Sequence, residues 1–262
     1  MYKQHLLSVL AIVGLAFTLI ACEPKYAITT THTPLQMGDT TVDVVLHDAE
    51  SPGLTYFNLH DDENTCVLAG LDVIGEYGGR VFELKHSGER RITFQLGGST
   101  YEFDPNRMFT EEGRAASLER FGNVSDEAIT AVGVFADQVL QLLNIDELDV
   151  LVTLHNTQSS YTIFNYTPGG DYENDAELVY VSERMDPNDY FFVTDRFVYD
   201  QLSQMDQNVV LQDNVNVTDD GSLSVWSAQQ YLVYVNVEAQ NGHRRAQRNM
   251  ILRVHEILYT ER

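Results

Sequence analysis

Residues 150–155 read Val-Leu-Val-Thr-Leu-His, a short and largely apolar run that ends at an imidazole. A run of this length without alternation is typical of a strand buried on both faces of a sheet. Two other strand candidates end in the same way, because residues 54–59 run into His60 and residues 231–237 run into Glu238. In open α/β sheets ligands bind at the carboxyl ends of the strands, so these segments predict one crevice lined by polar groups.

Around these segments the chain alternates between strand-like and helix-like stretches and has no internal repeat. The clearest helix candidate covers residues 64–77, with Asp61 or Asp62 placed to cap it and Gly78-Gly79 placed to stop it. Other helices are expected at 126–143 and 242–259, and other strands at 41–46, 80–84, 91–96, 101–103, 178–181 and 208–211. This order predicts an α/β fold in which residues 41–262 form a single domain with a mixed, mostly parallel sheet flanked by helices.

The N-terminus has the pattern of a targeting segment. Lys3 precedes an apolar stretch over residues 6–21, which is too short to span a bilayer comfortably. The stretch ends in Leu19-Ile20-Ala21-Cys22, which resembles the lipobox of bacterial lipoprotein signal peptides. The resemblance implies that residues 1–21 are a signal peptide and that Cys22 carries a lipid anchor. It places the protein in the bacterial cell envelope, facing the periplasm, and we favour the outer over the inner membrane. Residues 22–40 are then expected to form a tether.

The composition excludes several classes of function. The chain of 262 residues has 39 acidic and 16 basic residues and a formal charge of −23, which opposes nucleic acid as a partner. Hydrophobic residues make up 44%, enough for a folded core. A lipid on Cys22 would leave Cys66 as the only thiol, so no intrachain disulfide is expected. We interpret Cys66 as a small buried side chain on a helix.

The polar residues at the strand ends suit a metal. His60 and Glu63, with the distant His155, form a three-ligand zinc set that leaves a fourth position open to water. Glu238 would be the carboxylate beside that water, which is the general base that a zinc hydrolase needs. The alternative is that His60 and His155 only form hydrogen bonds at the edge of the core.

Three motifs carry a resemblance to a known family. Residues 104–109, Asp-Pro-Asn-Arg-Met-Phe, resemble the Asp-x-Asn-Arg motif of the zinc carboxypeptidase superfamily. His155-Asn156-Thr157 is similar to the His-Asn-Thr segment of its aspartoacylase and succinylglutamate desuccinylase branch. The segment around Glu238 resembles the one that holds the catalytic glutamate of the superfamily. The motifs follow the family's order between residues 54 and 245.

The resemblance implies a zinc carboxypeptidase-like fold in which His60, Glu63 and His155 hold one Zn²⁺ per chain. Glu238 matches the catalytic base of the family. These four residues occur in the family's order. That order would not be expected if His60 and His155 only formed hydrogen bonds at the edge of the core.

The resemblance also implies a binding site for a substrate carboxylate. Asn106 and Arg107 match the pair that holds it, a role that suits the bidentate fork of a guanidinium. Asp104 is expected to orient Arg107 or a ligand imidazole. The alternative for residues 104–107 is an ordinary surface turn.

The family uses a further arginine, upstream of the Asn-Arg pair, to stabilise the oxyanion. Arg90 and Arg91 lie 16 and 15 residues before Asn106. Alternation predicts that Ile92 and Phe94 face the core, and Arg90 shares their parity, so we expect Arg91 to point toward the site. The tyrosine that carboxypeptidases place over the substrate has no match. Residues 219–224 fit either a substrate loop or a solvated acidic turn.

The leading hypothesis is a lipid-anchored, zinc-dependent amide hydrolase of the carboxypeptidase or deacylase type. Its substrate would carry a free carboxylate, either as a peptide C-terminus, with peptidoglycan as one source, or as an N-acyl amino acid. The alternative is a non-enzymatic lipoprotein that uses the same fold as a binding or scaffolding module. The metal content of the purified protein distinguishes the two.

Overall fold

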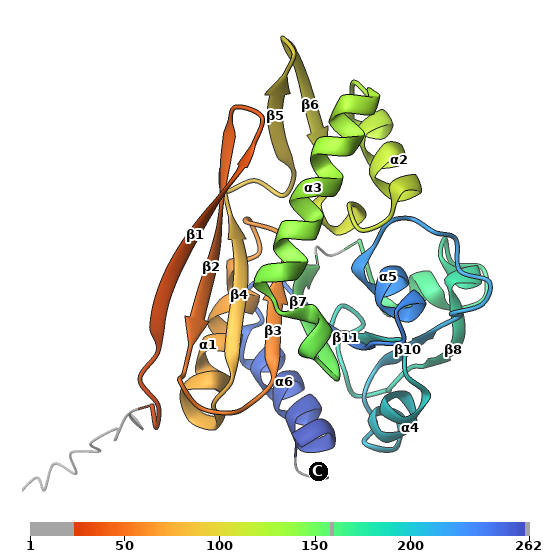
Figure 1. The fold of residues 1–262 in the computed structure, drawn as a ribbon. Coiled ribbons are helices and arrows are strands. Elements are labelled where there is room, and N and C mark those ends of the chain that lie inside the picture. The colour runs from red at the N-terminus through yellow and green to blue at the C-terminus, as the bar shows by residue number, and fades with distance from the viewer. Residues whose placement is uncertain (1–23, 158–159, 260–262) are drawn as a thin grey trace, which may run out of the picture.

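A computed structural model describes residues 24–157 and 160–259. Its centre is a nine-stranded sheet in the order β1-β2-β4-β3-β7-β11-β9-β10-β8, with β5 and β6 forming a separate hairpin (Figure 1). The strands are β1 (Thr29–Met37), β2 (Thr40–Asp48), β3 (Thr55–Asn58), β4 (Arg80–Lys85), β5 (Ile92–Leu96), β6 (Ser99–Phe103), β7 (Val150–Thr157), β8 (Ala176–Tyr180), β9 (Tyr190–Val193), β10 (Val209–Gln212) and β11 (Val233–Gln240).

Helices cover both faces of this sheet. The α-helices are α1 (Asn64–Tyr77), α2 (Glu111–Phe121), α3 (Asp126–Leu142), α4 (Arg196–Gln204), α5 (Leu223–Gln229) and α6 (Arg244–Tyr259). Short 3₁₀ helices are η1 (Pro105–Arg107), η2 (Ile145–Glu147), η3 (Ile163–Tyr166) and η4 (Glu173–Asp175). One core joins α1, α4 and α6 to the sheet, and a second joins α3 and the β5-β6 hairpin to the opposite face.

The middle of the sheet is parallel. Strands β4, β3, β7 and β11 run in one direction, whereas β9 and β10 run against them. The antiparallel pairs β1-β2, β2-β4 and β8-β10 complete the edges, so six of the nine strands share one direction. All eight residues of β7 are buried, as its continuous apolar run predicts. The predicted fold class, a mixed and mostly parallel sheet flanked by helices, is confirmed.

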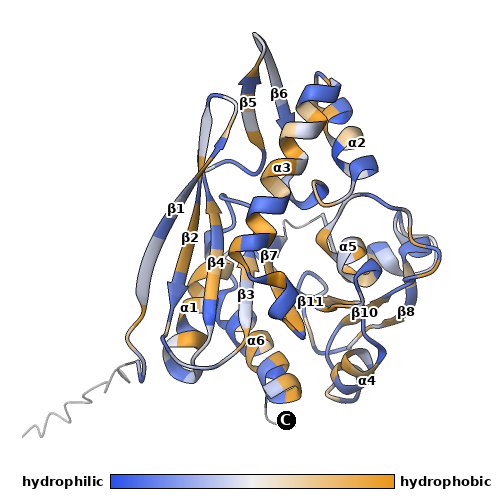
Figure 2. Ribbon diagram, in the orientation of Figure 1, coloured by the Kyte–Doolittle hydropathy of each residue, from blue (hydrophilic) through white to orange (hydrophobic). Residues whose placement is uncertain are grey.

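The first strand lies where the sequence predicts a tether. Residues 29–37, within the expected tether 22–40, form β1 and pair along their length with β2. The prediction is wrong for this stretch because β1 is an exposed edge strand, so no apolar alternation marks it. An edge strand also tolerates Pro34. In Figure 2, β1 is drawn mostly in pale and blue shades, whereas β2 and β4 carry orange segments.

The start of the chain remains a prediction from sequence. The expected signal peptide, residues 1–21, and the expected lipidation site Cys22 lie outside the described residues. Within residues 24–157 and 160–259, no helix is long and apolar enough to cross a membrane.

Helix α1 has the bounds that the sequence predicts, and Gly78 ends it with a φ of +85°. Its start differs from the expectation, because the N-cap residue is Glu63 and no side chain caps the helix. Asp61 instead accepts hydrogen bonds from the backbone N–H groups of His86 and Gly88, both at 2.7 Å. Glu63 occupies the N-cap position, but its carboxylate does not cap the helix.

The loop between β10 and α5 packs on the segment that holds Asn106 and Arg107. The Phe109 N–H donates to the Gly221 carbonyl at 3.1 Å, and the Leu223 N–H donates to Asn106 Oδ1 at 3.0 Å. Gly221 has a φ of +77°, and a Cβ there would lie 2.6 Å from the Arg107 carbonyl oxygen. The close approach therefore requires glycine, and it fixes residues 219–222 against Arg107.

This contact generates a prediction with a matched control. Gly98 also has a positive φ, +85°, but a Cβ at Gly98 would meet nothing within 4 Å. Gly98→Ala should lower the free energy of unfolding by about 1–2 kcal/mol through its backbone conformation alone. Gly221→Ala should lower it by roughly 1–3 kcal/mol more, because the added carbon overpacks the contact with Arg107. Urea denaturation of both variants measures the difference, and equal losses would show that the loop can move away without cost.

Candidate active site

His60 and Glu63 are brought together by a turn. His60 lies two residues after the end of β3, and the Glu63 N–H donates to the His60 carbonyl at 3.1 Å. This turn places both side chains on one side of the start of α1. His60 is fully buried and Glu63 is 4% exposed.

His155 and Glu238 lie on neighbouring parallel strands. In the register of β7 and β11, residue 155 pairs directly with residue 238. Both side chains are buried in the region where β3 also ends. The sequence argument from strand ends therefore places the four residues together, although β7 and β11 each continue two residues farther.

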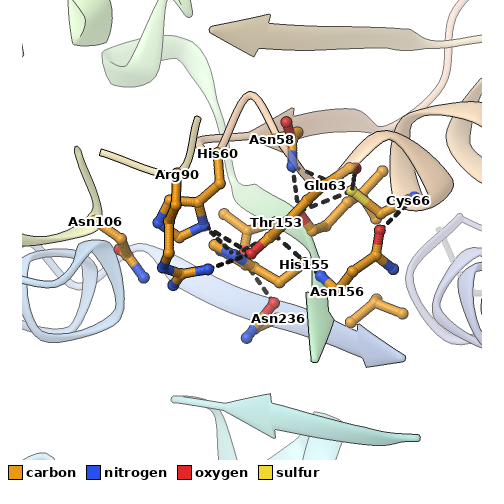
Figure 3. Close-up of polar contacts among 12 residues, drawn as sticks. Asn58, His60, Glu63, Cys66, Arg90, Asn106, Thr153, His155, Asn156 and Asn236 are labelled. Carbon is orange, nitrogen blue, oxygen red and sulfur yellow. Dashed lines mark hydrogen bonds and ion pairs between the residues drawn. The ribbon is translucent and has the colours of Figure 1, made fainter. Parts of the chain in front are cut away.

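The ligand atoms of His60, Glu63 and His155 converge (Figure 3). The two Nδ1 atoms are 3.1 Å apart, the His60 Nδ1 lies 3.0 Å from Glu63 Oε1, and the His155 Nδ1 lies 3.1 Å from Glu63 Oε2. Two ligands about 2.0–2.1 Å from a tetrahedral ion are about 3.3 Å apart, so the set has the dimensions of a zinc site.

The contact between Asp104 and His60 indicates what kind of group can bind between these ligand atoms. Asp104 Oδ1 lies 2.9 Å from His60 Nε2, and a carboxylate oxygen needs a donor there. A neutral His60 therefore carries its proton on Nε2 and directs the lone pair of Nδ1 at Glu63 and His155. A cation between His60 Nδ1, Glu63 and His155 Nδ1 would satisfy this lone pair and the Glu63 carboxylate together. The donor set of two imidazoles and one carboxylate fits a catalytic zinc ion with an open position.

The close packing of charged groups shifts the pKa values of His60 and Asp104. Burial by itself lowers the pKa of His60, but the carboxylates of Glu63 and Asp104 outweigh it and raise that pKa to about 9. Burial opposes ionisation of Asp104, yet His60 and Arg90 hold its pKa well below the usual range. The carboxylates of Glu63 and Asp104 therefore favour positive charge on His60.

Glu238 is a buried carboxyl group whose pKa is shifted in the opposite direction from that of Asp104. Burial raises the pKa of Glu238, the Glu63 carboxylate raises it further, and the value reaches about 8. Its Oε2 is buried and has no hydrogen-bond partner among the described residues. A group that must gain and lose a proton near neutral pH has these properties, and a cation beside it would favour its ionised form.

The structure places Arg90, and not Arg91, in the site. Arg90 Nη1 donates to Glu63 Oε1, and its Nε lies 3.5 Å from Asp104 Oδ2 (Figure 3). Arg91 instead pairs with Glu102 and lies over the ring of Phe121. The expectation for Arg91 is wrong because β5 begins at Ile92. The alternation of a strand therefore does not extend back to residues 90 and 91.

Asn106 and Arg107 lie at the other side of the site. The N–H of Asn106 donates to Asp104 Oδ1 at 2.8 Å, so the residue that caps the short helix η1 is also the one that contacts His60. Arg107 donates to its neighbour's carbonyl at 2.6 Å, and its Nε lies 3.3 Å from Asp220 Oδ2. Residues 104–107 thus line the site and are not a surface turn remote from it.

A cavity of about 400 Å³ joins these groups. Glu63, Arg90, His155 and Glu238 line it, and so do Arg107, Asp220 and several aromatic rings. Part of the 219–224 segment therefore forms a wall of the cavity.

Sequence reasoning missed the residues that support the site from behind. Gln247 of α6 is fully buried, and its Nε2 donates to the His155 carbonyl at 2.8 Å. Its Oε1 accepts from Asn156 Nδ2 at 2.8 Å, while Asn156 Oδ1 accepts from the Cys66 N–H at 2.9 Å. The sequence contains a signal for Gln247. It is a polar residue inside the apolar face of α6, three positions before Met250 and four before Ile251. Cys66 is fully buried in α1, as expected.

Comparisons with known proteins find distant structural likenesses. The chain is similar to murein-tripeptide amidase MpaA from Escherichia coli O157, with 11% identity over 88% of this chain and 92% of that one, at a TM-score of 0.42. It is similar to thrombin activatable fibrinolysis inhibitor, with 11% identity over 86% and 68% of the two chains, at a TM-score of 0.45. It is also similar to a metallo-carboxypeptidase from Burkholderia cenocepacia, with 9% identity over 88% and 65%, at 0.39. No family model and no characterised sequence matches. The chemistry of the site therefore rests on its own residues.

The convergence of ligand atoms from His60, Glu63 and His155 predicts that replacing a ligand residue removes the bound metal. His60→Ala and His155→Ala should each abolish stoichiometric zinc binding at neutral pH, because two ligands remain. His47→Ala is the control, since His47 also faces a carboxylate, Glu83 at 2.9 Å, but lies outside the site. Elemental analysis gives the occupancy.

Zinc at about 100 times its dissociation constant should stabilise the native protein and the His47 variant by about 2.7 kcal/mol, and a chelator should remove that gain. A His60→Ala/His155→Ala double variant that still binds one zinc per chain would refute the site.

Proposed function

We propose that the protein is a zinc-dependent, carboxypeptidase-like hydrolase that cleaves an amide bond next to a free carboxylate. The observation that carries the proposal is a cluster of three converging ligand residues, two of which, Glu63 and His155, line a cavity together with a buried carboxyl group and a guanidinium. A two-histidine, one-carboxylate set with an open position is the ligand pattern of catalytic zinc, as distinct from structural zinc. The motifs of residues 104–109 and 155–157 support the same family.

The metal ligands, Glu238 and Arg90 would each have a separate role in the proposed hydrolysis. Zinc bound by His60, Glu63 and His155 would act as a Lewis acid and make a water molecule nucleophilic near neutral pH. Glu238 would take the proton of that water and later give it to the leaving amine. The guanidinium of Arg90 would donate hydrogen bonds to the developing oxyanion, a role that suits a guanidinium held in the cavity wall by Glu63 and Asp104.

The substrate carboxylate would bind at Arg107 and Asn106. The guanidinium supplies a fork that matches a carboxylate, although here Asp220 occupies part of it. A substrate would therefore displace Asp220 from Arg107. We propose a peptide C-terminus as the preferred substrate over an N-acyl amino acid, since aromatic rings that can hold a side chain line the same cavity as Arg107.

We also propose that the protein acts in the bacterial cell envelope. The support is the sequence Leu19-Ile20-Ala21-Cys22, which would attach the chain to a membrane through a lipid on Cys22. A tethered hydrolase facing the periplasm would meet peptides of the cell wall. Peptidoglycan fragments are then one source of its substrate.

The assignment of the base predicts a loss of turnover without a loss of metal. Glu238→Gln should lower kcat by about 10²–10⁴-fold, because the amide cannot accept the proton. Zinc content should stay near native, since Glu238 is not among the ligands. Glu183→Gln, at an exposed position, is the control and should keep native turnover. If the Glu238 variant kept more than about a tenth of native kcat at matched zinc occupancy, the base would be another group.

Two adjacent arginines provide a sharp test of the oxyanion role. Arg90→Ala should lower kcat by about 10²–10³-fold, as expected when an oxyanion donor is lost. Arg91→Ala should stay near native, because Arg91 pairs with Glu102 outside the cavity. Steady-state kinetics are measured with zinc occupancy determined in parallel, since Arg90 also contacts the ligand Glu63. Equal effects of the two substitutions would contradict the placement of Arg90.

A further inference from the structure

The first described residues are attached to one end of α1. The Tyr26 N–H donates to the Gly75 carbonyl at 2.9 Å, and Tyr26 and Ile28 pack against the core that contains α1. A Cβ at Gly75 would lie 3.2 Å from Pro24 Cβ, so Pro24 also lies against this helix. Residues 24–28 are therefore part of the folded body and do not act as a free tether.

This attachment limits the distance between the folded body and a lipid on Cys22. Cys22 precedes Tyr26 by four residues, and four extended residues span at most about 14 Å. A bilayer that holds the lipid would therefore lie close to this end of α1. A long flexible tether would leave the orientation of the protein free, whereas a connection this short restricts it.

The C-terminal end of α1 belongs to one end of the whole molecule, which we call the basal end. It is formed by the starts of β3, β4, β7 and β11 and by the C-terminal ends of α1 and α6, and α1, α4 and the end of α6 lie along the lower edge of Figure 1. Val150 and Val233, which start β7 and β11, line a mostly apolar groove of about 300 Å³ with Ile257 and Leu258 of α6. His155 lies farther along β7, roughly 17 Å from Val150. The candidate active site is thus toward the opposite end of the central strands.

Aromatic and apolar side chains are exposed at the basal end. Tyr77 of α1 and His255 and Tyr259 of α6 form a row in which neighbouring ring centres are 4.9 Å apart. The two tyrosines are 37% and 41% exposed, and Phe197 of α4, which lines the groove with Leu258, is 49% exposed. Tyrosine suits the boundary between water and lipid because its ring is apolar and its hydroxyl is polar. These side chains therefore form a surface that fits the headgroup region of a membrane.

Charge determines the kind of membrane that this surface fits. The chain carries a formal charge of −23, which opposes contact with anionic lipids. Lys25 lies over the ring of Tyr26, and Arg248 pairs with Glu76. Strand β1 also begins close to Tyr26, but its exposed residues 29–33 are threonines and a histidine, which offer little apolar surface. The contact therefore depends on the aromatic and apolar side chains, and the matching surface is zwitterionic lipid.

We propose that the basal end rests on the bilayer that holds the lipid of Cys22. Tyr77, Tyr259 and the groove beside Phe197 enter the headgroup region, and the cavity lined by His155 is held toward the opposite end of the central strands. The membrane thus binds the protein at two places, the lipid and the basal end, and substrates arrive from the side away from the bilayer. The inference rests on the lipid anchor of the proposed function and does not depend on the proposed hydrolysis.

Quenching of tryptophan fluorescence by brominated lipid tests the contact. The full lipidated protein is reconstituted into phosphatidylcholine vesicles with or without bromine near the headgroup end of the acyl chains. Tyr259→Trp and Phe197→Trp should each lose fluorescence with bromine, because an interfacial surface enters the lipid by about 5–10 Å. Val124→Trp is the control and should lose none, since Val124 is 47% exposed but precedes α3, whose 17 residues span about 26 Å on the way to the start of β7. The native Trp226 is present in every variant and sets the common baseline.

Flotation of the vesicles and the mass of the N-terminal peptide separate this inference from the proposed function. Equal quenching of Tyr259→Trp, Phe197→Trp and Val124→Trp in the lipidated protein would overturn the basal contact and leave the anchor and the hydrolysis standing. A native protein without lipid on Cys22 would overturn the proposed anchor, and this orientation with it. Selective quenching in a protein that binds no zinc and cleaves no peptide would support the contact and contradict the proposed hydrolase. The two reporters lie on different helices, α4 and α6, so the comparison stands if one variant fails to fold.

Discussion

The buried carboxylate of Glu63 is the group on which the site depends. A charge that is 4% exposed is costly unless it is paired and hydrogen-bonded. Glu63 meets that cost with the Arg90 guanidinium and the Asn156 N–H at 3.0 Å, and its two oxygens lie 3.0 and 3.1 Å from the imidazoles of His60 and His155. These partners come from the turn after β3, the β4-β5 connection and β7. One carboxylate therefore holds three separate parts of the chain around the place where a cation fits.

Amide side chains hold the carboxyl ends of the central strands in place behind the ligand residues. Asn58 donates to the Leu154 carbonyl at 3.1 Å, and Gln247 spans the carbonyls of His155 and Val237 at 2.8 and 3.3 Å. These bonds link β3, β7, β11 and α6 just behind the ligands. A site must be held to within a fraction of an ångström to act, and buried side chains with satisfied hydrogen bonds provide that rigidity. The fold and the candidate chemistry thus share the same contacts.

The parts of the fold that the sequence predicts are those with a strong local signal. The runs of β3, β7 and β11 and the apolar stripes of α3 and α6 are long and periodic, and they place His60, His155 and Glu238 at one edge. The exposed strand β1 lacks that signal, and short elements such as β9 and α5 were not foreseen. Arg90 was misjudged because residues 86–91 connect strands, where side-chain direction follows from the path of the chain and not from alternation. Gln247 acts only through tertiary contacts.

The two guanidiniums of the cavity would allow a chain of charge −23 to bind an anion, as the proposed function requires. Arg90 and Arg107 are each held by acidic neighbours, so the positive charges are oriented before a substrate arrives. Under the proposed function, a substrate carboxylate at Arg107 would have to displace Asp220 from that guanidinium, so the same ion pair that orients Arg107 would compete with the substrate.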